Sequence, residues 1–407
     1  MKKYWKFTSI VVLIVLSIGT FYVTSALSAE QYPEFVIQTQ TGDEKEIDSL
    51  VLEGAYAADT STGNYRGTNV EINEEGSSYK NHSFLDRVIG QPPTLVKRLQ
   101  DEYRTFMRGK NSQVQSYFEN EQYVAYAAEN YQHGTLSTRF FLDLSVLNKE
   151  DGKIDTFTLE IPDGKELDYF YVEDVQMVEG ELHVITQNAV RMIRDQLNHE
   201  EHIYTIDVAG QKISSHEAII QVPEEQEDLR SNIQIVQTSP TQAHEQLIFV
   251  KTDWRIFEDA ESIRDEVASR EVYSYDLRTK ETMKIDVPNL PLDENQLSYF
   301  ENSTIYFMNL DGQELVVTPY SLVDHQVGKQ SRIQLSGVEG LMHGHTTIVK
   351  ENKLYLVSPQ MTPTIDADVI VADIRSGDIL FKGQLAMKDA SEEKGNFELF
   401  LHEVYVK

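Results

Sequence analysis

Two histidines separated by a single glycine are the residues in this chain whose types and spacing best suit chemistry. His343 and His345 stand in the segment MHGHT. Alternate side chains of an extended backbone point to one face, so the two imidazoles could bind one divalent cation. No third ligand is visible nearby, and a short loop before a strand explains the same residues. His343 and His345 are the candidate metal ligands, and a divalent cation is the one candidate cofactor.

The segment His199-Glu200-Glu201-His202 is similar to the zinc motif H-E-x-x-H only superficially. Its histidines are three residues apart rather than four, so a helix would not present both to one metal ion. The flanking segments have the pattern of strands, and we expect a loop between them. We therefore place no zinc here.

Calcium binding and nucleophilic catalysis find less support still. The segment 148–155, NKEDGKID, lacks the complete D-x-D-x-D-G loop and its distal glutamate, so we predict a hairpin with Asp151-Gly152 at its tip. The sequence has no G-x-S-x-G pattern, no S-x-x-K paired with K-T-G, no phosphate-binding loop and no cysteine. We name no catalytic residue, and enzymatic activity is the second hypothesis.

A cluster of cations is unusual in so acidic a chain. The segment QPPTLVKRLQDEYRTFMRGKN predicts an amphipathic helix over about 93–108, because its apolar residues recur at helical spacing. Its cations either contact an acidic partner or the outer membrane face, or they pair with acidic neighbours while the apolar stripe packs inward. The second interpretation is the simpler one. The candidate partner contacts are Lys97, Arg98, Arg104, Arg108 and Trp254, the last beside Asp253 and Arg255 after a predicted strand.

A degenerate repeat accounts for most of the chain. Its first half is a tight turn between two apolar strands, where Asn or Gly tolerates the positive φ of a two-residue hairpin. Successive copies lie about 50–65 residues apart. The predicted turns are Glu119-Asn120, Glu179-Gly180, His244-Glu245, Glu301-Asn302 and Glu351-Asn352.

The second half of each repeat is a strand, a polar turn and another strand. Asp143, Asp207, Asp276 and Asp373 occupy equivalent places before this turn, and Ser321 stands near that place in the fourth copy. An aspartate there accepts backbone N–H hydrogen bonds, which explains its recurrence better than catalysis does. Four strands per copy, repeated five times, indicate a β-propeller. A series of β-sandwich sheets without radial order is the alternative.

The repeat resembles the exported propellers related to quinoprotein-type and six-bladed sensor-like proteins, at superfamily level only. Such blades often carry a D-x-x-[ST]-G turn, which Asp373–Gly377 matches and Asp276–Lys280 matches without the glycine. The resemblance covers roughly residues 115–385. Quinone-binding blades use recurrent tryptophans, whereas this chain has only Trp5 and Trp254. The quinone cofactor is therefore not expected.

The two ends of the chain fit the repeat less well. FVIQTQTGDEKEIDSLVLEGAY predicts two strands around a turn, and the polar stretch 60–78 predicts a long loop or an irregular hairpin. The C-terminal FELFLHEVYVK alternates as a strand and is expected to pair with an N-terminal strand. That pairing would make a sixth, composite blade, and a seventh follows if 35–90 forms a complete one.

Residues 7–29 carry no charge and follow three lysines, which predicts a transmembrane signal-anchor rather than a cleaved signal peptide. Positive charges favour the cytoplasm, so everything after about residue 30 is expected to be extracytoplasmic, or secreted if the segment is cleaved. The absence of cysteine suggests a Gram-positive surface. We expect a cytoplasmic start (1–6), the anchor (7–29), N-terminal strands, loop and helix packed on the propeller (30–115), and propeller repeats (116–407).

The composition restricts the partners. The chain has 66 acidic and 36 basic residues and a net charge of −30, which disfavours nucleic acid. The fold prediction is an all-β propeller of about six blades with one amphipathic helix, preceded by a single transmembrane helix. We expect an accessory or regulatory surface protein that binds a ligand, a membrane protein complex or a cell-wall component. A hydrolase or lyase acting on cell-wall or extracellular polysaccharide is the alternative.

Overall fold

The computed structural model describes the greater part of the chain, with gaps. The described residues are 19–20, 32–58, 68–79, 92–134, 138–162, 164–191, 197–220, 229–236, 238, 243–258, 263–287, 297–335, 346–388 and 396–406. They fold into two compact units. The first unit comprises residues 1–91, 310–315 and 331–407, and the second comprises 92–309 and 316–330. Each unit is considered by itself.

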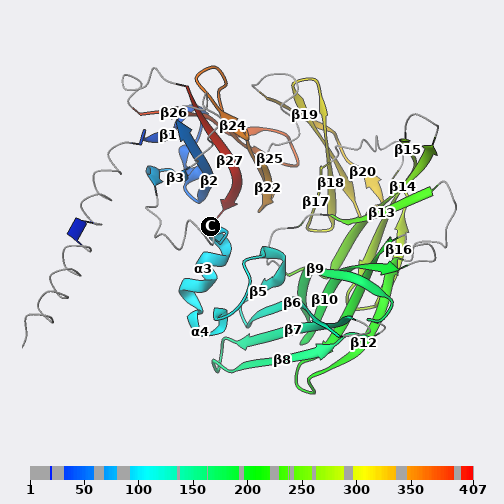
Figure 1. Ribbon diagram of the computed structural model, residues 1–407. Coiled ribbons are helices and arrows are strands. Elements are labelled where there is room, and N and C mark those ends of the chain that lie inside the picture. Colours follow the sequence, from blue (N-terminus) through cyan, green and yellow to red (C-terminus); the bar gives the residue numbers. More distant parts are fainter. Residues whose placement is uncertain are drawn as a thin grey trace, which may run out of the picture. The chain divides into compact units, whose positions relative to one another are not determined.

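The described residues form an all-β structure of six sheets with four or five strands each (Figure 1). Three sheets of the second unit are antiparallel meanders whose strands follow chain order. Each of these sheets is therefore formed by consecutive strands of one repeat copy. The first comprises β5 (Tyr117–Glu119), β6 (Tyr123–His133), β7 (Thr138–Asn148) and β8 (Ile154–Glu160). The next comprises β9 (Leu167–Val178), β10 (Glu181–Arg191), β11 (Leu197–Asp207) and β12 (Lys212–Ile220). The third comprises β13 (Leu229–Ile235), β14 (Gln246–Glu258), β15 (Ile263–Asp276) and β16 (Glu281–Ile285).

The fourth repeat copy forms a further sheet from β17 (Leu297–Glu301), β18 (Thr304–Asp311), β19 (Glu314–Ser321) and β20 (Gln326–Val327), with β21 (Ser331–Gln334) paired to β19. Hydrophobic clusters join consecutive sheets of the second unit, because alternate residues of one strand serve opposite faces. Val184 of β10 packs in the cluster shared with β5–β8, whereas its neighbour Ile185 packs in the cluster shared with β13–β16. A sheet covered on both faces by other sheets is the arrangement of a propeller blade.

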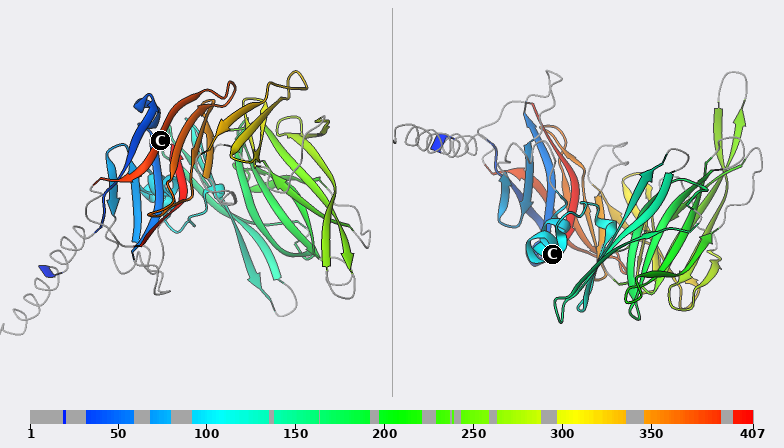
Figure 2. Two further views of the ribbon diagram at one scale, coloured as in Figure 1. Left: turned by 90° about the horizontal axis from the view of Figure 1, so that it is seen from above. Right: turned by 60° about the horizontal axis from the view of Figure 1, so that its bottom comes forward.

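The two ends of the chain meet in two sheets of the first unit. The C-terminal β27 (Phe397–Val406) pairs with β2 (Leu50–Ala58), which confirms the predicted composite sheet. Figures 1 and 2 show the red β27 beside the blue β2 in each view. The sheet is completed by β3 (Thr68–Asn73), β4 (Gly76–Tyr79) and β24 (Gln360–Met361). Part of the polar stretch 60–78 is therefore a hairpin.

The fifth repeat copy also recruits an N-terminal strand. Strand β1 (Phe35–Gly42) pairs with β26 (Ile379–Met387), next to β25 (Asp368–Asp373), β23 (Lys353–Val357) and β22 (Thr346–Lys350). A short 3-10 helix, η1 (Glu44–Ile47), separates β1 from β2. Because the N-terminal strands divide between two sheets, the segment 35–90 makes no separate seventh sheet from its described residues. Phe35, Leu52, Phe381 and Leu399 are fully buried in one shared core.

Two of the five predicted turns are correct in position and in cause. Glu179 and Gly180 take positive φ angles of 51° and 85° between β9 and β10, and Glu351 and Asn352 take 54° and 62° between β22 and β23. At the fourth turn the positive φ angles belong to Asn302-Ser303, one residue later than predicted. The third prediction is wrong, since ten residues separate β13 from β14 and His244-Glu245 are the last two of them.

The repeated aspartates mostly fix turns, as predicted. Asp276 Oδ1 accepts hydrogen bonds from the N–H groups of Arg278 and Thr279, and Asp373 Oδ1 accepts two equivalent bonds. Lys280 takes a positive φ of 59°, the conformation that Gly377 takes at 77° in the other copy. Asp207 and Ser321 also accept turn hydrogen bonds.

Asp143 is the exception among the repeated aspartates. It lies inside β7 and accepts hydrogen bonds from the side chains of Asn130 and Thr158. The turn comes five residues later because β7 is longer than expected, and Asn148 Oδ1 accepts the N–H of Glu150 there. Gly152 has a φ of 72°, so the segment 148–155 contains a hairpin turn as predicted.

The predicted signal-anchor, 7–29, lies outside the described residues except for Gly19 and Thr20. Among the helices formed by described residues, none has both the length and the apolar character needed to cross a membrane.

Candidate functional site

The predicted basic helix forms in two pieces. α3 (Thr94–Glu102) begins after Pro93, and α4 (Arg104–Met107) follows a break at Tyr103, whose backbone has φ −120° and ψ 49°. Leu95, Leu99 and Phe106 are buried, as the apolar stripe predicted. The break turns the second half of the predicted helix away from the first, because Tyr103 leaves the helical conformation.

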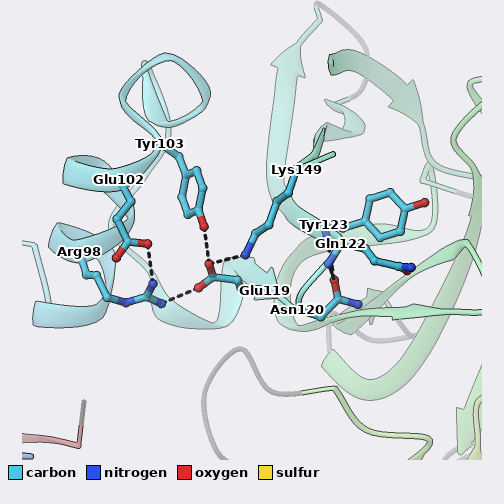
Figure 3. Close-up of polar contacts among 8 residues, drawn as sticks. All are labelled: Arg98, Glu102, Tyr103, Glu119, Asn120, Gln122, Tyr123 and Lys149. Atoms are coloured by element: carbon cyan, nitrogen blue, oxygen red, sulfur yellow. Dashed lines mark hydrogen bonds and ion pairs between the residues drawn. The ribbon is translucent and has the colours of Figure 1, made fainter. Parts of the chain in front are cut away.

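Glu119 organises the cations around α3 (Figure 3). Its carboxylate accepts hydrogen bonds from Arg98 at 2.5 Å, Lys149 at 2.8 Å and the Tyr103 hydroxyl at 2.8 Å. Burial pushes the pKa of Glu119 upward, but these three donors together hold it below its usual value. Arg98 also binds Glu102 at 2.9 Å, so this predicted partner contact is engaged within the chain.

The other predicted cations divide into two groups. Arg104 and Arg108 are exposed on and just after α4, while Lys97 is half-buried and takes part in interactions of its own. Lys110 donates to the Phe106 carbonyl and lies 4.1 Å from the centre of the Phe106 ring. Burial lowers the pKa of Lys110 to about 8. A partner contact at Lys97, Arg104 or Arg108 stays a prediction.

The remaining predicted site residues are dispersed. Trp254 lies within β14 rather than after a strand, is half-buried, and has a buried indole N–H without an acceptor among the described residues. His343 and His345 lie outside the described residues. The expected loop at 199–202 is instead part of β11, because these residues alternate across a ladder with β10. Among the described residues no group of three or more His, Asp or Glu side chains could hold a metal ion.

Three carboxyl side chains that sequence analysis did not single out lie together on the sheet β9–β12. Glu173 and Asp174 come from β9 and Glu201 from β11; we call them the acid cluster. The register of β9 and β10 shifts at this point, where Asp174 faces Ile185 and Val172 faces Thr186. Glu173 is thus the extra residue of a β-bulge, and bulges re-aim side chains.

Glu173 and Glu201 form a carboxyl pair. Glu201 is 0% exposed, and its Oε1 accepts a hydrogen bond from Gln187 Nε2 at 3.0 Å. The same Gln187 nitrogen reaches the Ile233 carbonyl of the neighbouring sheet at 3.3 Å. Burial raises the pKa of both glutamates, and the mutual hydrogen bond raises that of Glu201 further. Both carboxyls therefore keep their protons to a higher pH than exposed glutamates do.

Asp174 is the third member of the acid cluster. Its carboxylate accepts hydrogen bonds from Gln176 Nε2 at 2.9 and 3.2 Å and from the Val175 N–H at 2.9 Å. Burial nevertheless raises the pKa of Asp174 to about 7. Gln176 in turn accepts the N–H of His244 at 2.9 Å, which connects the acid cluster to the start of β14.

Two exposed tyrosines border the acid cluster on β9. Tyr171 donates to Gln187 Oε1 at 2.5 Å, and Tyr169 contacts His199 Nε2 at 2.8 Å. Their side chains are 38% and 39% exposed. The sheet thus presents aromatic surface next to a hydrogen-bonded path that leads through Gln187 to Glu201. Such a site can hold and release protons and can accept hydrogen bonds from a cationic group.

The opposite face of the same strands carries a histidine pair. His202 Nδ1 lies 2.8 Å from His216 Nε2, and His202 Nε2 lies 2.9 Å from Glu200 Oε2. The Tyr204 ring stacks on His216 with 4.5 Å between centroids. These side chains form an internal hydrogen-bonded chain.

The sequence carries only a weak signal for the acid cluster. Reading 197–207 as a strand would have placed His199, Glu201 and Ile203 on one face, and a carboxyl beside isoleucine on an inward face is informative. The bulge at Glu173 has no such signal, because neither Gly nor Pro marks it.

No protein-family model matches the chain, and no curated protein sequence matches it. Among solved structures, the polysaccharide lyase Uly1 shares 9% identity at a TM-score of 0.33, over 70% of this chain and 57% of that one. The chain thus spans little more than half the length of that structure. Citrobacter koseri AztD shares 8% identity at a TM-score of 0.34, over 87% of this chain and 96% of that one. The Dos1 propeller shares 8% identity at a TM-score of 0.29, over 65% and 75%. The described residues themselves form an all-β structure of six sheets.

Proposed function

We propose that the chain is a membrane-anchored extracytoplasmic binding protein, an accessory or regulatory subunit whose sheets present a surface for a partner. The observation that carries the binding role is the acid cluster with Tyr169 and Tyr171 exposed at its border. Side chains held by paired strands are ordered before any partner arrives, which lowers the entropic cost of binding. The uncharged segment 7–29 supports the anchoring part of the proposal.

The charge of the chain supports a basic partner. Without Lys2, Lys3 and Lys6 the remaining sequence carries a net charge of −33. An acidic surface attracts basic partners over a Debye length of about 10 Å at moderate salt. The partner is therefore expected to present lysine or arginine to the side of the sheet that carries Tyr169 and Tyr171.

Topology can be tested cleanly because the chain has no cysteine. A single cysteine at exposed Asp151, in the β7–β8 turn, would be labelled by a membrane-impermeant maleimide on intact cells. A cysteine replacing Lys3 would be labelled only after the cells are broken. Labelling of the Lys3 variant on intact cells, or of neither variant, overturns the anchored orientation.

The binding role is tested by crosslinking the full-length chain in its own membranes. The recovered partners are identified and compared between variants. Tyr169→Ala with Tyr171→Ala should reduce the recovered partner at least tenfold. The matched control is Tyr131→Ala, an exposed tyrosine on β6 of another sheet. Equal recovery from the unsubstituted chain and both variants, or no reproducible partner, contradicts the proposal.

A polysaccharide-acting hydrolase or lyase is the second candidate, favoured by the raised pKa values of Glu173 and Glu201. A carboxyl that keeps its proton near neutral pH is what general acid catalysis requires. The test is release of reducing or unsaturated sugar ends from cell-wall and extracellular polysaccharides. Turnover that Glu201→Gln lowers by about 100-fold supports the enzyme, and absence of turnover rejects it.

A further inference from the structure

The β14–β15 hairpin extends beyond the outer strand beside it (Figure 1). β15 pairs with β14 along its whole length, from Ile263 to Asp276, but it pairs with β16 only from Val272 onward. Within the described part of the chain, residues 263–271 thus have a neighbouring strand on one side only. We call these residues the open edge, because the backbone of an edge strand can add a further strand.

An extra residue in β15 sets which way the side chains of the open edge point. Asp253 of β14 pairs with Ser269, whereas the next residue, Trp254, pairs with Val267. Ala268 is therefore the extra residue of a β-bulge, and the alternation of side chains shifts by one residue at this point. The residues that share one face, each paired with an alternate residue of β14, are Arg264, Glu266, Ser269 and Glu271.

We propose that the open edge is a dimer interface, at which β15 pairs antiparallel with β15 of a second copy of this chain. Two copies related by a two-fold axis present the same strand to one another, so residues equally far from the axis lie opposite. The axis passes between Val267 and Ala268. Arg264 of each copy then lies opposite Glu271 of the other, on the same face of the sheet. Opposite charges directly across two strands attract, and the symmetry makes this contact twice.

The opposite face of the sheet fits the same axis. By sequence position an aspartate, residue 265, stands opposite Arg270 of the other copy. Val267 is 37% exposed and lies next to the axis, so a second copy covers this apolar side chain. Trp254, which sequence analysis proposed as a partner contact, pairs with Val267 on the adjacent strand. The centre of the interface is therefore apolar, with charged residues on both sides of it.

The charges of the open edge favour this register over its neighbours. Moving one copy by two residues in one direction sets Glu266 opposite Glu271, and like charges directly opposite are destabilising. Moving it in the other direction sets Arg264 opposite Ser269 and loses the charge pair. Charged side chains normally keep edge strands apart. Here they complement a second copy in one register, which is the self-complementarity that a two-fold interface requires.

The net charge of the chain determines the conditions for dimerisation. Two copies that each carry a net charge of −30 repel one another at long range. At physiological ionic strength the Debye length is about 8 Å, so this repulsion is screened while the contacts between adjacent strands persist. Backbone hydrogen bonds supply the affinity, and the charges select the register. The inference goes beyond the proposed function, because it concerns a different sheet from the acid cluster and does not depend on membrane anchoring.

The experiment is sedimentation velocity of the full-length chain in detergent micelles at about 0.15 M salt. We expect a monomer–dimer equilibrium that Arg264→Glu and Glu271→Arg each weaken by about tenfold or more, since two attractive contacts become repulsive. A mixture of the two variants should recover the dimer, because each reversed charge then meets its opposite. Arg278→Glu is the matched control, an equal charge change in the exposed β15–β16 turn, and should leave the dimer unchanged.

Three results overturn the proposal. The first is an unsubstituted chain that stays monomeric at every concentration. The second is a dimer that neither charge reversal weakens. The third is a mixture of the two variants that contains no more dimer than each variant alone, since this shows that Arg264 and Glu271 do not face one another.

A disulfide measurement keeps Arg264 and Glu271 in place and covers the case in which a charge reversal prevents folding. Directly opposite residues of antiparallel strands have Cα atoms about 4.5–5.5 Å apart, within the range that a disulfide spans. Because the chain has no cysteine, one tagged copy can carry Glu266→Cys alone and a differently tagged copy Ser269→Cys alone. The mixed disulfide should form about tenfold faster or more than between Ser269→Cys and Glu281→Cys, which lies on β16. Equal rates for the two pairs, or no mixed disulfide, reject the interface.

Discussion

Replacing Asp174 by Asn should remove a large part of the pH dependence of stability in the second unit. The folded state holds the proton of Asp174 up to about pH 7, whereas an unfolded aspartate loses it near 3.8. Between these values the folded state binds more protons than the unfolded state, so stability falls as pH rises. Asparagine keeps an acceptor oxygen for Val175 and Gln176 but carries no charge at any pH.

The structure sets the size of this effect. Each tenfold change in proton affinity is worth about 1.4 kcal/mol, so the full interval corresponds to about 4 kcal/mol. Between about pH 5 and pH 8 the chain should lose about 3 kcal/mol of unfolding free energy through Asp174. Solvent screening at this half-buried side chain reduces the expected loss to about 1.5–3 kcal/mol. Asp174→Asn should gain this much stability relative to the unsubstituted chain over that interval.

The assay is urea unfolding of the full-length chain, followed through Trp254 after Trp5 is replaced by Phe. Trp254 lies on β14 in the same unit as Asp174, so its fluorescence reports the relevant transition. Glu121→Gln, at an exposed turn between β5 and β6, is the matched control and should follow the unsubstituted chain. Parallel pH profiles for Asp174→Asn and the unsubstituted chain would refute the reasoning.

Three other predictions concern the rest of the fold. Glu119→Gln should cost about 2–3 kcal/mol of unfolding free energy at neutral pH, because three donors lose a charged acceptor. The cost should shrink as pH falls through the lowered pKa of Glu119. Urea unfolding at neutral pH and at a pH below that pKa checks it. Lys110 should react with an amine-modifying reagent at a half-point near pH 8, read by peptide mass spectrometry, and a half-point near 10.5 contradicts the account. Leu399→Ala should destabilise the first unit by about 2–5 kcal/mol in a protease-resistance assay, whereas exposed Phe400→Ala should change it little.

The sequence predicted the sheets well because the repeat is local. Each two-strand turn is fixed by residues that touch one another, such as Glu351 and Asn352 with their positive φ angles. Even the pairing of β27 with β2 followed from the leftover strands at both ends, since unpaired strands leave exposed backbone groups. Asp143 was misplaced because strand length depends on how far the neighbouring strand extends, and β6 and β7 pair over eleven residues.

The candidate site was less predictable because it depends on register between strands. Glu173, Gln187 and Glu201 come from three strands, and their proximity follows from a bulge that the sequence does not mark. Treating 199–202 as a loop also removed the alternation that would have turned Glu201 inward. The contacts of the basic helix were easier to predict, because Arg98 and Glu102 are one helical turn apart in the sequence.

The acid cluster is difficult to explain as a stabilising feature of the fold. The same sheet face carries Ile185 and Ile203, which pack in one hydrophobic cluster with Ile233 of the neighbouring sheet. Glu201 sits at the end of that apolar series, where an isoleucine would extend the core at no cost in buried charge. A bulge that brings a second carboxyl to this place adds repulsion instead of relieving it. Stability alone therefore favours replacing the pair, and the proposed binding role supplies a reason for keeping it.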